Sequence, residues 1–233
     1  MLCVAAGVLV LTACTATVGG TALPRHSKTL PVEQILPSAA EVAAAVGNPI
    51  DPGGPLTRGG VDVLPNGIRD DSAASPIGCL GAVLPFMRVV YEKGDIRAVA
   101  WQDFSRFGTG ATVSSVDAGV IDFGSNAEAQ RMFDAFAAQW RGCQGTTMST
   151  HLPVGDLHAT VTDVRTNGPI LSATIRNGDT GDADSFPTEH AVGVAGSYIV
   201  DVDAAITAGA PAERVATGRA VRLATVMLDK IGD

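Results

Sequence analysis

Apolar and β-branched residues gather into strand-like runs in the first half of the chain. The runs cover residues 88–92, 95–104 and 113–123, and aromatic and β-branched side chains are frequent in them. Lys93-Gly94 separates the first two runs and is typical of a tight turn. We therefore predict three strands here, the first two joined as a hairpin.

The second half of the chain shows the same pattern of strand-like runs separated by turn signals. Four further strands are predicted at residues 158–166, 169–176, 189–194 and 198–203. Asn167-Gly168 between the first two is a strong hairpin signal, and Gly196 marks a second turn between the last two. Successive hairpins, instead of strand–helix–strand crossovers, indicate an antiparallel sheet.

Two capping boxes predict the starts of helices. Ser38 with Glu41 opens a short helix, and Ser125 with Glu128 opens a longer one that ends at Gly142. The longer helix has apolar residues at three- and four-residue spacing, which indicates a core-facing side. These residues are Ala129, Met132, Phe133, Phe136, Ala137 and Trp140.

A third helix is predicted near the C-terminus, over residues 211–231. Pro211 suits its first turn, and its buried side would carry Val215, Leu223, Met227 and Ile231. The expected fold class is therefore α+β: a largely antiparallel sheet of hairpins, three main helices packed on it, and one disulfide.

The first residues read as an export signal. Residues 2–14 are almost wholly apolar but fall short of the roughly 20 residues that a membrane-spanning helix needs. The stretch ends in Leu11-Thr12-Ala13-Cys14, which resembles a bacterial lipobox, so we expect lipid attachment at Cys14. The alternatives are an ordinary secretory signal or a buried first strand. Export signals open with positive charge, yet the first basic residue is Arg25, so we expect basic residues upstream.

Three segments follow from this interpretation. Residues 1–13 would be the signal peptide, residues 14–35 the lipidated cysteine with a flexible tether, and residues 36–233 the folded domain. The net charge of −8 excludes nucleic acid as a partner and also excludes electrostatic adhesion to anionic lipid, because both need clustered Lys and Arg.

Cys79 and Cys143 remain once the signal region is set aside. In an oxidising compartment such a pair usually forms a disulfide, and closing this loop would stabilise the fold by roughly 4 kcal/mol. A redox pair would favour Cys-x-x-Cys spacing, and a zinc site would need further ligands at suitable spacing. We expect a structural disulfide.

No motif for catalysis or metal binding stands out. The chain has no G-x-S-x-G nucleophile elbow, and His26, His151, His158 and His190 lack metal-site spacing. The acidic stretch at residues 179–184 fails the EF-hand pattern and is interpreted as a solvated hairpin tip. We therefore expect no catalytic residue, no metal and no cofactor.

One strand could carry a binding surface. Strict alternation along residues 95–104 places Arg97, Trp101 and Asp103 on one face, and Ile96 on the other. A tryptophan beside an arginine and a carboxylate can stack on a ring or sugar while its polar neighbours orient it. The alternative is that a helix covers Trp101 and that its neighbours are simply solvated.

Several of these segments together resemble the PknH-like extracellular domain. They are Cys79-Leu80-Gly81, Val90-Tyr91-Glu92, Trp101-Gln102, Val120-Ile121-Asp122-Phe123 and Gln139-Trp140-Arg141-Gly142-Cys143. The resemblance runs from about Leu36 to Ile231, and its most specific part is the pairing of Cys79 with Trp140-x-x-Cys143. That family includes the outer sensor module of a mycobacterial receptor kinase and exported mycobacterial lipoproteins.

The resemblance implies a mixed helix–sheet domain in the cell envelope, with a ligand cleft and no known catalytic activity. The chain departs from the kinase in two ways: it lacks the kinase and its membrane span, and it can form one disulfide where the kinase sensor holds two.

We therefore expect a non-enzymatic, sensor-like protein held on the cell membrane by lipid and facing the periplasm or cell wall. Its partner would be a small molecule or glycan bound in a cleft. The alternative is a docking module for another envelope protein, with no small ligand.

Overall fold

A ten-stranded antiparallel sheet forms the centre of the molecule. The computed structural model describes residues 30–108, 110–178, 186–207 and 218–232. The strands follow the order β1-β4-β5-β10-β9-β8-β7-β6-β3, and β2 pairs with β4 beside β1. The long strands are β4 (Ile96–Ser105), β5 (Val113–Phe123), β6 (Thr147–Leu152), β7 (Gly155–Asn167), β8 (Ile170–Asn177), β9 (Phe186–Ala195) and β10 (Tyr198–Ile206). The short ones are β1 (Asp51–Pro52), β2 (Thr57–Gly59) and β3 (Ala74–Ser75).

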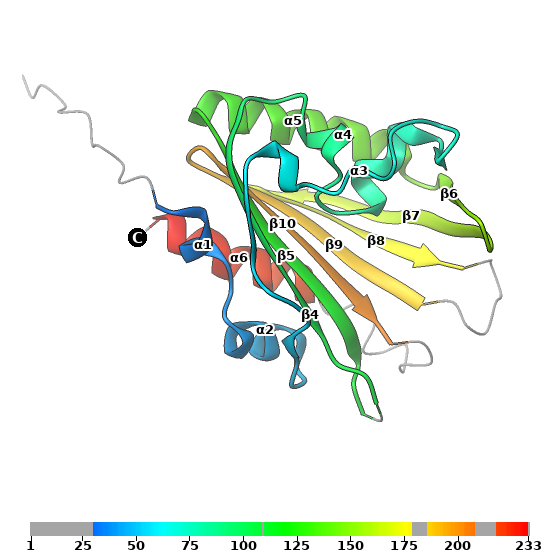
Figure 1. The fold of residues 1–233 in the computed structure, drawn as a ribbon, viewed down its shortest axis with the longest axis horizontal. Helices are drawn as coiled ribbons and strands as arrows, with labels where there is room; N and C mark the ends of the chain where they lie inside the picture. Colours follow the sequence, from blue (N-terminus) through cyan, green and yellow to red (C-terminus); the bar gives the residue numbers. More distant parts are fainter. Residues whose placement is uncertain (1–29, 109, 179–185, 208–217, 233) are drawn as a thin grey trace, which may run out of the picture.

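Helices cover both faces of this sheet (Figure 1). The upper face in that view carries α3 (Leu80–Val83), α4 (Arg88–Tyr91) and α5 (Asn126–Cys143). The lower face carries α1 (Val32–Ile35), α2 (Ala39–Val46) and α6 (Arg219–Gly232). Two 3-10 turns, η1 (Val61–Val63) and η2 (Ile77–Cys79), complete the elements. Two separate apolar clusters fill the spaces between the sheet and the helices.

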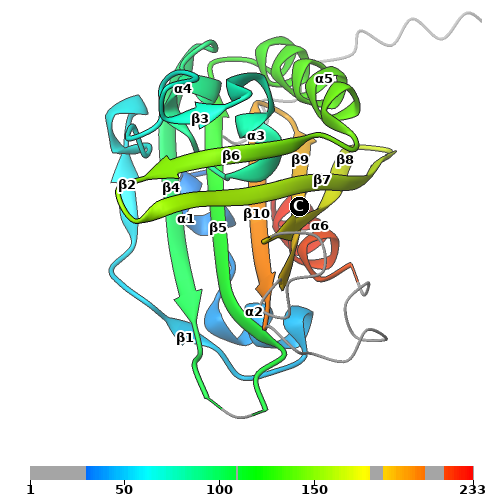
Figure 2. The same cartoon turned by 90° about the vertical axis from the view of Figure 1, so that its right-hand side faces the viewer.

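The sheet is strongly curved. Strands β6 and β7 run crosswise to β4, β5 and β10 when the molecule is seen from its side (Figure 2). A bulge between Thr162 and Arg165 interrupts the pairing of β7 with β8, and Asp163 there has a φ of 52°. Bulges bend a strand and redirect its side chains, so this one contributes to the turn of the sheet.

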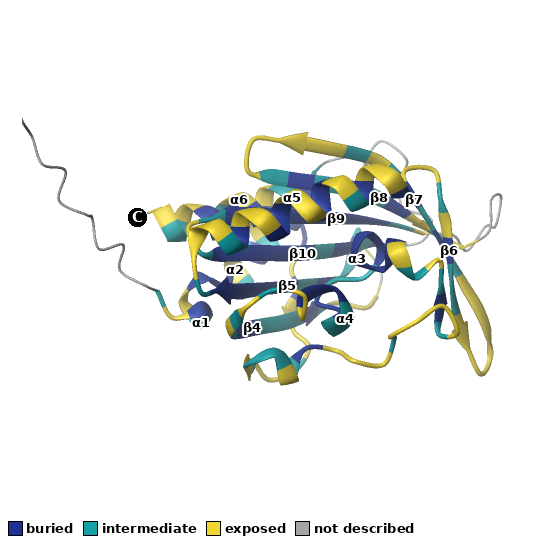
Figure 3. Cartoon of the chain, turned by 90° about the horizontal axis from the view of Figure 1, so that it is seen from above, coloured by how far each residue is buried: buried dark blue, intermediate teal, exposed yellow. Residues whose placement is uncertain are grey.

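Local signals placed two helices as predicted. Ser38 and Glu41 form a complete capping box on α2, and Gly47 ends this helix with a left-handed φ of 80°. The Ser125 hydroxyl accepts a hydrogen bond from the backbone N–H of Glu128 at the start of α5. Buried residues of α5 lie on the side turned to the sheet, and exposed ones lie outside (Figure 3). The α+β fold class is confirmed, and so are the hairpins β7–β8 and β9–β10.

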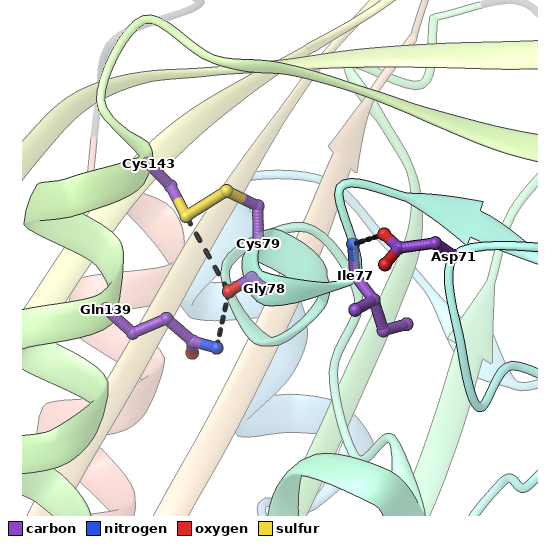
Figure 4. The surroundings of a disulfide bond; sticks show 6 residues. All are labelled: Asp71, Ile77, Gly78, Cys79, Gln139 and Cys143. Carbon is purple, nitrogen blue, oxygen red and sulfur yellow. Dashed lines mark hydrogen bonds between the residues drawn. A yellow bond between two sulfur atoms is a disulfide. The ribbon is translucent and has the colours of Figure 1, made fainter.

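The disulfide between Cys79 and Cys143 is confirmed. It joins η2 to the end of α5, and the amide of Gln139 donates a 2.6 Å hydrogen bond to the carbonyl of Gly78 beside it (Figure 4). Cys143 is the last residue of α5, so the helix continues one residue past the predicted end at Gly142. The bond therefore fixes the start of the segment that crosses the upper face.

Three predictions about elements were wrong. Residues 88–92 begin with the helical turn α4, because burial of Val90 and Tyr91 against the sheet overrides their strand preference. Strand β6 was missed, since its exposed polar residues give no apolar pattern. The folded domain begins before residue 36: α1 occupies residues 32–35 of the expected tether and buries Val32 and Ile35.

Helix α6 begins later than predicted among the described residues, at Arg219, and residues 211–217 with Val215 lie outside them. No helix in the described ranges is long and apolar enough to cross a membrane.

Candidate functional site

The structure does not place all three side chains predicted to bind a ligand on one face of the sheet. Trp101 packs against the upper core cluster, and Asp103, two residues further along β4, shares that face. Arg97 lies in a register shift between Ile96 and Ala98 and is exposed. The alternation assumed at the start of the strand was wrong, because this bulge places Ile96 in the same cluster as Trp101.

Trp101 is half-buried and covered by other parts of the chain. Its ring stacks on Phe86, with centroids 6.1 Å apart and planes inclined by 21°. Its indole N–H donates a 3.4 Å hydrogen bond to the carbonyl of Val63 in η1. Phe86 therefore occupies one face of the indole ring, and a ligand role for Arg97, Trp101 and Asp103 stays a prediction.

A row of polar side chains crosses the sheet on this upper face. Asp103 of β4 pairs with Asp117 of β5. Asp117 pairs in turn with Asp203 of β10, which pairs with His190 of β9. Directly opposite residues point to one face with Cβ atoms about 4.5–5.5 Å apart. Asp201 lies two residues from Asp203 on β10 and faces the same way.

His190 and Asp201 form a buried ion pair at the end of this row. The Nδ1 atom of His190 lies 2.9 Å from the carbonyl oxygen of Ala82, and a carbonyl only accepts, so Nδ1 carries a proton. The Nε2 atom lies 2.7 Å from Oδ1 of Asp201, whose other oxygen accepts from Tyr91 and from the backbone of Phe86. Burial disfavours a second proton on the ring, but the charge of Asp201 and its hydrogen bond to Nε2 favour the protonated imidazole.

The pKa values in this row are shifted upward. Burial and the negative charges of Asp103 and Asp201 raise the pKa of Asp117 to about 6. Burial is also the largest cause for Asp203 and raises its pKa to about 8, while a positive charge on His190 opposes that shift. Burial alone would lower the pKa of His190, but the neighbouring carboxylates outweigh it and raise the pKa.

The segment that packs over this row includes a residue with a strained backbone conformation. Phe86 has a φ of 58°, a conformation that bulky side chains rarely adopt, and its N–H donates a 3.2 Å hydrogen bond to Asp201. Its ring lies directly over Gly119, where an added Cβ would come within 2.5 Å of a ring carbon. The glycine therefore permits the close approach of Phe86 to the sheet.

A cavity of about 510 Å³ lies on the opposite, lower face beside the first half of α6. Its walls come from the polar side of β7 and β8, from Glu189 on β9, and from α6. The lining residues include Asp163, Arg165, Asn167, Ile170, Ser172, Thr174, Glu189, Ala220, Val221 and Thr225. Such a volume is in the range of ligand pockets for small molecules.

The cavity offers hydroxyl, amide and charged groups together. Beyond the β7 bulge, Arg165 pairs with Ser172, so both side chains face the same way. Arg165 also lies 3.9 Å from Asp163 in an exposed ion pair. Opposite them, the Thr225 hydroxyl donates to the carbonyl of Val221 and keeps its acceptor capacity. This combination can bind a neutral, hydroxyl-rich molecule or one with a weakly held anionic group.

The floor of the cavity is rigid. Glu189 and Arg219 form a buried ion pair at 3.0 Å, and the Glu189 carboxylate also accepts hydrogen bonds from the backbone N–H groups of Arg219 and Ala220. The carboxylate therefore caps the start of α6. Arg219 further donates to the carbonyl of Val46 at the end of α2. These bonds position α6 against β9 and fix one wall of the cavity.

The described residues contain no group of three or more His, Cys, Asp or Glu side chains that could hold a metal ion. Cys14 and the acidic stretch at residues 179–184 lie outside the described residues.

Sequence reasoning missed the pair His190–Asp201 and the residues that line the cavity, although the family resemblance implied a cleft. His190 was weighed only as a metal ligand, whereas it partners a single carboxylate. A usable signal was present in β10, where Asp201 and Asp203 stand on one face of an otherwise apolar strand. A buried carboxylate needs a partner, so this pattern points to a cation on a neighbouring strand.

One comparison with known proteins identifies a family, and another finds a similar fold. The sequence model of the PknH-like extracellular domain matches residues 29–230. The crystal structure of the extracellular domain of PknH from Mycobacterium tuberculosis is similar, with a TM-score of 0.72 at 20% identity over 86% of this chain and 94% of that one. A hypothetical protein from Helicobacter pylori aligns over 50% of this chain and 83% of that one, with 14% identity and a TM-score of 0.28 that supports no argument. Among curated proteins there is no match.

The family match extends over most of the sequence and includes every element described above except the last residues of α6. The fold of the PknH domain also agrees with this architecture of one large antiparallel sheet between helices. The chain belongs to the PknH-like extracellular domain family.

Proposed function

We propose that this protein is a lipid-anchored, non-enzymatic component of the cell envelope that binds a small polar molecule or glycan fragment. The observation that carries this proposal is the cavity of about 510 Å³ beside α6, with its convergent polar groups. Membership in an extracellular domain family supports a location facing the periplasm or cell wall.

The chemistry of the cavity favours a ligand rich in hydroxyl groups. Ser172, Thr174 and Asn167 supply donors and acceptors that match sugar hydroxyls, and Ile170 supplies an apolar surface for a ring face. Arg165 would add a charge-assisted hydrogen bond to a carboxylate or phosphate on such a ligand. The buried pair Glu189–Arg219 holds the site in shape before the ligand arrives.

The proposal is tested by titrating the full-length chain in detergent with defined soluble glycan fragments of the cell wall. We expect saturable binding in calorimetry that weakens at least about tenfold in the variant Arg165→Ala with Ser172→Ala, because two or more polar contacts are lost. The control is Thr147→Ala on β6, an exposed threonine outside the cavity. Equal affinities in both variants would exclude this cavity as the binding site.

A second candidate is docking onto another envelope protein. Three apolar side chains are exposed at the β6–β7 hairpin: Leu152 at 39%, Val154 at 94% and Leu157 at 61%. Exposed apolar side chains close together are common at protein interfaces. Cross-linking in intact cells from a cysteine introduced at Val154 would detect such a partner, and an absence of any adduct would leave this candidate without support.

A further inference from the structure

One extra residue in β7 determines which side chains this strand presents to the cavity. The pairing of β7 with β8 has Thr162 opposite Thr174, and nearer the turn it has Asn167 opposite Ile170. Between these two positions β7 contains one residue more than β8, and the bulge that follows Thr162 absorbs the difference. Because side chains alternate along a strand, the place of the bulge decides which of the intervening residues face the cavity.

The observed bulge places Arg165 directly opposite Ser172, and both residues line the cavity. A bulge nearer the turn would place Val164 opposite Ser172, so an apolar side chain would take the position of the arginine. In the structure Val164 faces the other side of the sheet and packs against the upper apolar cluster. The place of the bulge therefore determines that the cavity contains Arg165.

Three features hold the bulge at this place. The side-chain oxygen of Gln144, the residue that follows α5, accepts a 2.8 Å hydrogen bond from the backbone N–H of Val164. Asp163 has a φ of 52°, a left-handed conformation that aspartate adopts more readily than its β-branched neighbours Thr162 and Val164. The third feature is the packing of the Val164 side chain on the upper cluster.

The backbone on both sides of Gln144 is fixed. Cys143 precedes it, ends α5 and forms the disulfide with Cys79. Gly145 follows it and donates a 2.8 Å hydrogen bond to the carbonyl of Val161 on β7. The Gln144 side chain therefore reaches the bulge from a backbone that is tied both to the upper layer and to β7 itself.

On the basis of the binding function suggested above, we propose that Gln144 is a positioning residue of the cavity. It fixes the β7 bulge and thereby directs Arg165 into the cavity, which makes the cavity select ligands that carry an anionic group beside their hydroxyls. Without the Gln144 oxygen, the N–H of Val164 loses its protein acceptor and the bulge is free to move toward the turn.

The charges around the cavity favour an anionic ligand. Among the described residues Arg165 has one ion pair, at 3.9 Å with Asp163, and exposed pairs of this kind contribute little to stability. A carboxylate or phosphate of a ligand can replace Asp163 and accept two parallel hydrogen bonds from the guanidinium. The carboxylate of Glu189 does not compete for Arg165, because it is paired with Arg219 and caps the start of α6.

Calorimetric titration of the full-length chain in detergent tests this selection with two sugars of closely similar shape, N-acetylmuramic acid and its neutral carboxamide. We expect the wild-type chain to bind the acid at least about tenfold more tightly, because the carboxylate gains a charge-assisted hydrogen bond. In the variant Gln144→Ala this preference for the acid should fall at least about threefold. A general weakening of the fold would instead reduce the binding of both sugars by the same factor.

Two further variants serve as comparisons. Gln144→Glu keeps an oxygen acceptor for the N–H of Val164 and should retain the preference for the acid. Gln130→Ala is the matched control, since Gln130 is an exposed glutamine of α5 whose amide donates to Asp134 and not to β7. Gln144 is exposed as well, so its replacement should leave the fold intact.

Nuclear Overhauser effects between β7 and β8 report the register without any ligand. In the wild-type chain we expect contacts between protons of Arg165 and Ser172. In Gln144→Ala these contacts should weaken, and contacts between Val164 and Ser172 should appear. Unchanged contacts in Gln144→Ala, or an unchanged preference for the acid, would overturn the role of Gln144.

The two sugars also separate this proposal from the binding function on which it rests. Equal affinities of the wild-type chain for the acid and the carboxamide would overturn the selection of an anionic ligand and would leave the binding function of the cavity in place. Binding of neither sugar to the wild-type chain would contradict both.

Discussion

At the scale of single residues, the side chain of Asp201 connects three separate parts of the chain on the upper face. Asp201 accepts hydrogen bonds from the Tyr91 hydroxyl and the Phe86 backbone N–H, both more than a hundred residues away in the chain. Its other oxygen is hydrogen-bonded to the ring of His190 on the neighbouring strand. A buried carboxylate loses its hydration and depends on these donors, so removing one of them should lower the free energy of unfolding measurably.

The variant Tyr91→Phe isolates one of these bonds. Because the acceptor is charged and buried, we expect the free energy of unfolding at pH 7 to fall by about 1.5–3 kcal/mol in urea denaturation. Tyr198→Phe is the control: its hydroxyl donates to the neutral carbonyl of Leu30, so a loss of about 0.5–1.5 kcal/mol is expected. Equal losses would contradict an ionised Asp201.

At the scale of elements, local signals and tertiary contacts explain different parts of the fold. Asn167-Gly168 and the Ser125–Glu128 cap determine their turn and helix start through adjacent residues, so both were predictable from sequence. Residues 88–92 were not, because contact with the sheet, and not local preference, makes them helical. The row from Asp103 to His190 depends on the register of four strands, which no local pattern specifies.

One buried ion pair contributes to the position of α6. Glu189→Gln removes the buried carboxylate that pairs with Arg219 and weakens the cap of the helix, so we expect a loss of about 3–5 kcal/mol in the free energy of unfolding. Glu33→Gln is the control, since its pair with Arg58 spans 3.6 Å and is exposed, and it should cost less than about 1 kcal/mol. A small effect of Glu189→Gln would show that the other contacts of α6 are sufficient to position it.

At the scale of the whole molecule, the two faces of one sheet carry different groups of polar side chains. The upper face, which α3, α4 and α5 cover (Figure 1), holds the row from Asp103 to His190. The lower face holds a polar cavity beside α6. Among the described residues the first element is α1, and the stretch between Cys14 and Val32 stays the proposed tether.

The proposed anchor is a property of the whole chain in the cell. In the variant Cys14→Ala the thiol that would carry the lipid is gone, so the protein should move from the membrane fraction to the aqueous fraction. Immunoblots of fractionated cells measure this, with Cys3→Ala as the control that should remain with the membrane. An unchanged distribution of Cys14→Ala would refute the lipid anchor.

The most direct test of ligand binding in the cavity is native mass spectrometry of the full-length chain, released from detergent after incubation with fractionated envelope extract. We predict a retained adduct of one small polar molecule or glycan fragment on the wild-type protein and its loss in the variant Arg165→Ala with Ser172→Ala. An unmodified mass across all fractions, or an adduct that the cavity variant keeps, would contradict the proposed function.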